Sequence, residues 1–172
     1  MDHLVLTVIA ADQPGLVERV AECIAAHEGN WLEGRMARMA GQFAGILSVS
    51  VPSERHGELV AALNGLAAHG IRVLLAHSGI NPGHDWKPVL LDLVGNDRPG
   101  IVRDITRLLA RQGVNLESLI TEVHPAPMSS EPLFHAEALL AVPLDLPLDV
   151  LREQLEELAD DLMVELVLRV ES

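Results

Sequence analysis

Positive charge is scarce in this chain. Its 172 residues include 12 Lys and Arg against 25 Asp and Glu, which gives a formal net charge of −13 with His neutral. A surface that binds nucleic acid needs a basic stripe to neutralise phosphates, and the sequence shows none. The composition therefore argues against nucleic acid as a direct partner.

Cysteine and long apolar runs are also scarce. A single cysteine, Cys23, excludes an internal disulfide and fits a reducing compartment. No apolar stretch is long enough to span a membrane, and the first residues lack the basic and apolar regions of a signal peptide. Apolar residues still make up 49% of the chain, enough for a packed core. We therefore expect a soluble cytoplasmic protein with no membrane partner.

The sequence contains an internal repeat. A shift of 85 positions lays residues 4–33 onto residues 89–118 without a gap. The identical pairs are Leu6/Leu91, Asp12/Asp97, Pro14/Pro99, Gly15/Gly100, Val17/Val102, Ala25/Ala110 and Asn30/Asn115. The repeat predicts two small domains, residues 1–79 and 87–172, joined by a linker at residues 80–86 that is rich in turn residues.

Hydrophobic periodicity predicts the same order of elements in each copy. In the first copy we expect strands at 4–10, 30–40, 42–51 and 71–77, with helices after Gly15 and over 54–69. In the second we expect strands at 89–94, from Asn115, at 133–142 and at 163–170, with helices after Gly100 and over 148–162. This βαββαβ order predicts an α+β fold, two ferredoxin-like units with antiparallel sheets and helices on one face. The first strand is apolar on both faces, so we expect the other copy or a second chain to cover it.

The strongest local motif is Asp-x-Pro-Gly between the first strand and first helix of each copy, at residues 12–15 and 97–100. The glycine permits close approach to the backbone, and the N–H groups of the following helix favour a small anion such as a carboxylate. Helix capping is the alternative, and for Asp12 and Asp97 alone we favour it. Because the whole loop recurs, ligand binding explains it better.

Asn30 and Asn115 lie at the same spacing after the two loops. We expect them to open the second strand near the same end of the sheet as the loop. A carboxamide there can offer a donor and an acceptor to an amino acid. Turn formation after a helix explains an asparagine equally well, so both interpretations stay open.

Catalytic and metal-binding patterns are not evident. The eight histidines show no metal-ligand spacing, and no nucleophile lies in a pattern with a base. Cys23 lies beside Ile24 on the apolar side of its helix, which favours an inert buried thiol. We expect no enzyme, no catalytic residue, no metal and no cofactor. The acidity is greater in the second copy, where it indicates either a solvated face or a basic protein partner.

A βαββαβ unit with Asp-x-Pro-Gly after its first strand resembles the ACT domain, a regulatory module that typically binds amino acids. Two such units in tandem, without a catalytic domain, resemble the glycine cleavage system transcriptional repressor family. The segments that carry this resemblance include Gly29-Asn30-Trp31-Leu32-Glu33 and Val114-Asn115-Leu116-Glu117-Ser118-Leu119. The Pro125–Pro132 insert departs from the first copy and could cover a site or a partner surface.

The resemblance implies a ligand where the strand–helix loop of one ACT module faces the second strand of its neighbour. The ligand-binding residues that it implies are Asp12, Pro14, Gly15, Leu16 and Asn30 in the first copy, and Asp97, Arg98, Pro99, Gly100, Ile101 and Asn115 in the second. Gln13 stands where the second copy has Arg98, so the two pockets differ. Arg98 could pair with a ligand carboxylate or lie at the surface.

The resemblance also implies a function and partners. We expect a non-enzymatic regulator that responds to an amino acid such as glycine and contacts a DNA-binding transcriptional regulator, as a homodimer. The alternative is a detached regulatory subunit of an enzyme of amino-acid or one-carbon metabolism. A small enzyme on a ferredoxin-like scaffold is a third hypothesis, for which the sequence offers no catalytic set.

Overall fold

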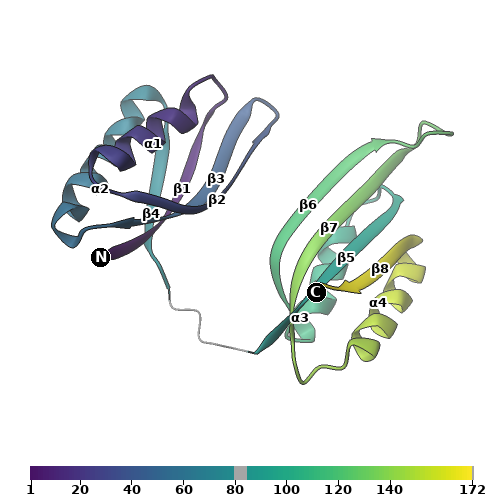
Figure 1. Cartoon of the computed structure of the whole chain (residues 1–172). Coiled ribbons are helices and arrows are strands. Elements are labelled where there is room, and N and C mark those ends of the chain that lie inside the picture. Colours follow the sequence, from purple (N-terminus) through teal and green to yellow (C-terminus); the bar gives the residue numbers. More distant parts are fainter. Residues whose placement is uncertain (80–84, 172) are drawn as a thin grey trace. The chain divides into compact units, whose positions relative to one another are not determined.

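A computed structural model describes residues 1–79 and 85–171 of the chain (Figure 1). The chain divides into two compact units, residues 1–80 and 81–172, and each is described by itself. The predicted linker at residues 80–86 lies mostly outside the described residues. Among the described residues, no helix is both long and apolar enough to cross a membrane.

The first unit has the predicted βαββαβ order. Its elements are β1 (Asp2–Ala11), α1 (Leu16–Ala26), β2 (Asn30–Met39), β3 (Gln42–Val51), α2 (His56–Gly65) and β4 (Arg72–His77). The strands form one antiparallel sheet in the order β2-β3-β1-β4, and both helices cover the same face (Figure 1). The β2–β3 turn at Ala40 and Gly41 has positive φ at both residues, as a two-residue hairpin requires.

The second unit repeats this architecture. Its elements are β5 (Trp86–Asn96), α3 (Ile101–Arg111), β6 (Asn115–Pro125), β7 (Pro132–Pro143), α4 (Leu148–Leu162) and β8 (Val164–Val170). The sheet order is β6-β7-β5-β8. The predicted fold, two ferredoxin-like units in tandem, is therefore confirmed. The Pro125–Pro132 insert forms the tip of the β6–β7 hairpin, where Met128 is almost fully exposed.

The core of each unit lies between its sheet and its two helices. In β1 every second side chain points to the helices, so Leu4, Leu6 and Val8 are all buried. Apolar residues of α1 at intervals of four, Leu16, Val20 and Ile24, close the core from the other side. β5 and α3 supply the equivalent residues of the second unit.

The opposite face of each sheet is more exposed than the sequence predicts. Ile9 on β1 is 36% exposed and Ile46 on β3 is 50% exposed. In the second unit, Leu90, Asp92 and Val94 on the same face of β5 are half-buried. The expected covering of this face by another copy or chain stays a prediction.

The helix predicted over residues 54–69 is interrupted. Only His56–Gly65 is α-helical, and 3₁₀ turns at Ser53–Arg55 and Leu66–His69 flank it. Glycines at 57 and 65 weaken the α-helix, and short 3₁₀ segments are common at helix ends. Gly70, at φ 79°, ends the segment, as its position in the sequence indicated.

Candidate functional site

Two equivalent loops connect the first strand of each unit to its first helix. The first loop is residues 12–15 and the second loop is residues 97–100. The Asp12 N–H donates to the Gly41 carbonyl at 2.9 Å, and the Asp97 N–H donates to the Pro132 carbonyl at 3.0 Å. Both loops are therefore held against the turn of the neighbouring hairpin, in the second unit against the Pro125–Pro132 insert.

Glycine, and not aspartate, occupies the cap position of each helix. Gly15 and Gly100 have left-handed backbone conformations, with φ of 87° and 93°, and no side chain bonds to the helix N-terminus in the parts of the chain described. The capping role favoured for Asp12 and Asp97 is therefore wrong. Each aspartate lies three residues before the cap, and the Asp12 carboxylate instead accepts a hydrogen bond from Arg38 at 3.4 Å.

The first turn of each helix offers backbone donors. The first intrahelical bonds run from Arg19 N–H to Gly15 O and from Asp104 N–H to Gly100 O. The N–H groups of residues 16–18 and 101–103 therefore lack acceptors within their helices. The side chains of Leu16 and Ile101 are buried in the core, so these two predicted site residues can contact a ligand only through their backbones. The donors and the helix dipole suit a small carboxylate.

The electrostatic surroundings of the two loops differ. In the second loop, Arg103 extends over Gly100, and its guanidinium lies 2.8 Å from the position that a Cβ on Gly100 would occupy. Arg98 is exposed in the same loop. The repeat places Glu18 and Gln13 at the equivalent positions of the first loop. Arg103 Nε also donates to the Asp104 carboxylate at 3.0 Å, so this guanidinium is partly neutralised. Arg98 in place of Gln13 adds a positive charge that the first loop lacks, which favours an anionic group at the second loop.

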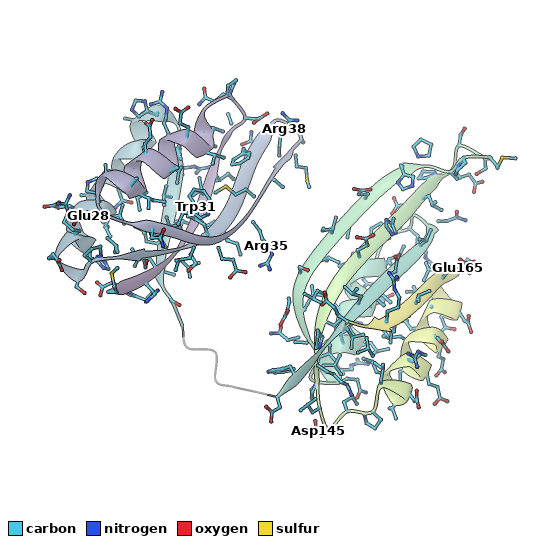
Figure 2. All side chains as sticks on the ribbon, viewed as in Figure 1. Glu28, Trp31, Arg35, Arg38, Asp145 and Glu165 are labelled. Carbon is cyan, nitrogen blue, oxygen red and sulfur yellow. The ribbon has the colours of Figure 1, made fainter. Side chains whose placement is uncertain are left out.

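The two asparagines lie at the wrong end of the sheet to join the loop of their own unit. Asn30 pairs with Ser50, which pairs with His3 near the start of β1, whereas the first loop follows the end of β1. Ala11 is eight positions after His3, a distance of about 26 Å along a strand. Figure 2 labels Trp31 near the start of β2 and Arg38, which contacts Asp12 of the first loop, near its end.

Asn115 has the same relation to the second loop, since it pairs with Ala141, the partner of Pro88. The expectation that the asparagines lie near the loop is wrong for a single unit. An asparagine can reach a ligand at such a loop only from another ACT module.

The sequence analysis missed a polar cluster at the start of β1. The Asp2 carboxylate accepts a hydrogen bond from Ser53 Oγ at 2.8 Å and lies 2.7 Å from His56 Nδ1. The Ser53 hydrogen bond, followed by the His56 contact, holds the pKa of Asp2 below its ordinary value. The Ser53 hydroxyl donates its proton to Asp2 and not to His56. His56 therefore does not act as a base toward Ser53, and the cluster is not a nucleophile–base pair.

Cys23 is half-buried against the core of the first unit. Burial raises the pKa of its thiol, which lowers the fraction of reactive thiolate at neutral pH. We expect Cys23 in the folded protein to react with iodoacetamide more slowly than free cysteine at the same pH. The guanidinium-unfolded chain, as the control, should react at the free-thiol rate. Equal rates in the folded and unfolded chain would contradict this assignment.

A second cluster that the sequence analysis missed lies on the exposed face of the second sheet. It comprises Asp92 on β5 with His135 and Glu137 on β7, and their nitrogen and oxygen atoms lie within 4.8 Å of one another. His135 and Glu137 are two positions apart on β7, but Asp92 lies 43 positions before His135 on another strand, so local motif spacing does not indicate a set of three. Only the register between β5 and β7 brings them together.

Comparison with known proteins gives two family matches. Residues 2–73 and residues 89–160 each match a family model described as ACT domain. A UPF0237 protein of Methanococcus maripaludis is 30% identical over 83 residues, which cover 46% of this chain and 92% of that protein.

Two crystal structures match along the whole chain. An unknown protein from Galdieria sulphuraria is 28% identical with a TM-score of 0.86, and 99% of each chain is covered. A protein proposed to be a glycine cleavage system transcriptional repressor is 19% identical with a TM-score of 0.71, covering 99% of this chain and 98% of that chain. At that identity the second likeness shows the fold alone.

Proposed function

Because this chain belongs to the ACT-domain family, with two ACT domains in tandem, we propose that it is a non-enzymatic regulator that responds to an amino acid. It acts on transcription by contact with a DNA-binding regulator. The crystal structure proposed to be a glycine cleavage system transcriptional repressor supports the transcriptional role, and the net charge of −13 argues against direct contact with DNA. The amino acid binds at the second loop, through its carboxylate.

One observation carries the choice of the second loop. The Arg103 guanidinium lies over Gly100, beside three N–H groups that have no acceptor within their helix. A carboxylate there gains charge-assisted hydrogen bonds in addition to the favourable helix dipole. The first loop has Glu18 in place of Arg103 and Gln13 in place of Arg98, so neither of these two guanidinium groups is present there to receive a carboxylate.

The outer face of α4 supports contact with a basic protein surface. It carries five exposed acidic side chains and no basic side chain among them: Glu153, Glu156, Glu157, Asp160 and Asp161. Such a surface repels nucleic acid and speeds association with a basic partner. This agrees with a regulator that acts through a DNA-binding protein without contacting DNA itself.

A thermal-shift screen against the common amino acids, including glycine and serine, tests the proposal. A ligand at 100 times its dissociation constant should stabilise the folded protein by about 2.7 kcal/mol. We expect a selective shift with one or a few amino acids, and none with the corresponding amines that lack the carboxylate. A shift that persists with the amines would contradict carboxylate recognition at the second loop.

The choice of partner is tested separately, with the full chain as bait in the presence and absence of the amino acid found by the screen. Altered DNA binding by a transcriptional regulator supports the proposal. Altered turnover of a metabolic enzyme, with no effect on any regulator, would contradict the proposal. It would favour the alternative that the chain is a detached regulatory subunit of that enzyme.

A further inference from the structure

The cluster Asp92–His135–Glu137 lies on rigid strands in the middle of a sheet. Asp92 and Glu137 are direct partners on β5 and β7, and His135 lies two residues before Glu137 on the same face. His135 Nε2 lies 3.0 Å from Asp92 Oδ1 and 3.8 Å from Glu137 Oε1. The side chains of Asp92 and His135 are 31% and 26% exposed, so the cluster is open to solvent and partly desolvated.

The charges of this cluster are poorly balanced. Two carboxylates directly opposite each other on neighbouring strands repel and destabilise the pairing. The exposed Arg169 reaches only Asp92, with 4.0 Å between its Nη2 and Asp92 Oδ2. Glu122, which pairs with His135, and Glu165, which pairs with Val94 beside it, add negative charge to the same face. A cation between the two carboxylates would relieve this repulsion.

We propose that Asp92, His135 and Glu137 bind one divalent transition-metal ion, with zinc as the best-fitting member of the class. Two ligand atoms on a tetrahedral zinc, with bonds of about 2.0–2.1 Å, lie about 3.4 Å apart. The distances of 3.0 and 3.8 Å from His135 Nε2 to the two carboxylate oxygens bracket that value. The Glu137 side chain is 59% exposed and has room to adjust.

The ligand types select the class of metal. Imidazole nitrogen favours zinc and its transition-metal neighbours over magnesium and calcium, which prefer an all-oxygen shell. Three protein ligands leave at least one position on the metal for water. This arrangement is independent of the second loop, so the metal site and the amino-acid site can each be present without the other.

The first unit provides an internal comparison. At the positions equivalent to Asp92, His135 and Glu137 it has Thr7, Ala44 and Ile46, because Thr7 pairs with Ile46 and Ile9 pairs with Ala44 in the matching register. None of these three side chains is a usual metal ligand. The fold therefore does not require the cluster, and the second unit carries it in addition.

Zinc titration of the chelator-treated full chain by calorimetry tests the proposal. We expect one tight site in the wild type, and an affinity at least about tenfold lower in His135→Gln and in Glu137→Gln. Glu122→Gln is the matched control, since it removes the same charge from the same face outside the cluster. It should keep the tight site. Thermal unfolding of each metal-free variant checks that the fold is retained.

Two results would overturn the proposal. The first is a wild-type chain with no tight zinc site, which would mean that the contacts of Asp92 with His135 and Arg169 hold the cluster without a metal. The second is a tight site that survives both His135→Gln and Glu137→Gln, which would place the zinc at other residues.

Discussion

Replacing Gly100 by valine is expected to abolish amino-acid binding at the second loop. Gly100 has φ 93°, a conformation that a β-branched residue adopts only with strain. The new side chain would meet the Arg103 guanidinium, 2.8 Å from the Cβ position, and displace it from the N–H groups that receive the carboxylate. The measurement is the ligand-induced thermal shift of the variant relative to its own ligand-free transition.

This substitution also lowers the stability of the fold, by about 1–3 kcal/mol from backbone strain. Gly15→Val is the matched control, because Gly15 has nearly the same φ, 87°, and nothing lies within 4 Å of its Cβ position. We expect the control to lose similar stability and keep the ligand response. If Gly15→Val loses the response and Gly100→Val keeps it, the amino acid binds at the first loop.

Most of the fold could be predicted because the repeat and the hydrophobic periods agree in both copies. Alternation in β1 and β5 and intervals of four in α1 and α3 each specify one buried face. The βαββαβ order then leaves few topologies. The outer faces of the sheets were less predictable, because an apolar sequence on both sides of a strand does not say what covers the second side.

The predicted position of Asn30 and Asn115 was wrong because α1 and α3 carry the chain back along the sheet. Each helix has 11 residues and covers about 16 Å. The strand after the helix therefore starts near the beginning of the first strand, far from the loop. Spacing along the sequence places Asn30 and Asn115 equally well at either end, and only the helix direction decides.

The sequence placed the Asp-x-Pro-Gly motif correctly between the first strand and the first helix of each unit. The helix-capping role predicted for its aspartate was wrong. An aspartate before a helix is typical of a cap, but here the glycine with positive φ occupies that position. The aspartate contributes through its backbone N–H, which ties the loop to the hairpin. The Asp92–His135–Glu137 cluster could not be found from the sequence, since it depends on the exact register of β5 against β7.

Replacing Leu6 by alanine is expected to lower the free energy of unfolding of the first unit by about 2–5 kcal/mol. Leu6 is fully buried in the centre of β1, between the sheet and both helices, so the truncation leaves a cavity that close-packed neighbours cannot fill. Chemical denaturation of the variant and the wild type, followed by circular dichroism, measures the difference.

Leu74→Ala is the control on the other face of the same sheet. Leu74 pairs with Thr7 and is 71% exposed, so its truncation should change the stability by no more than about 0.5 kcal/mol. If Leu74→Ala lowers the free energy of unfolding nearly as much as Leu6→Ala, the outer face of the sheet must be covered in solution. A concentration-dependent transition would then identify a second copy as the cover, since dimerisation stabilises the fold by mass action. The apolar outer face of β1 would in that case be explained by the homodimer that the sequence predicts.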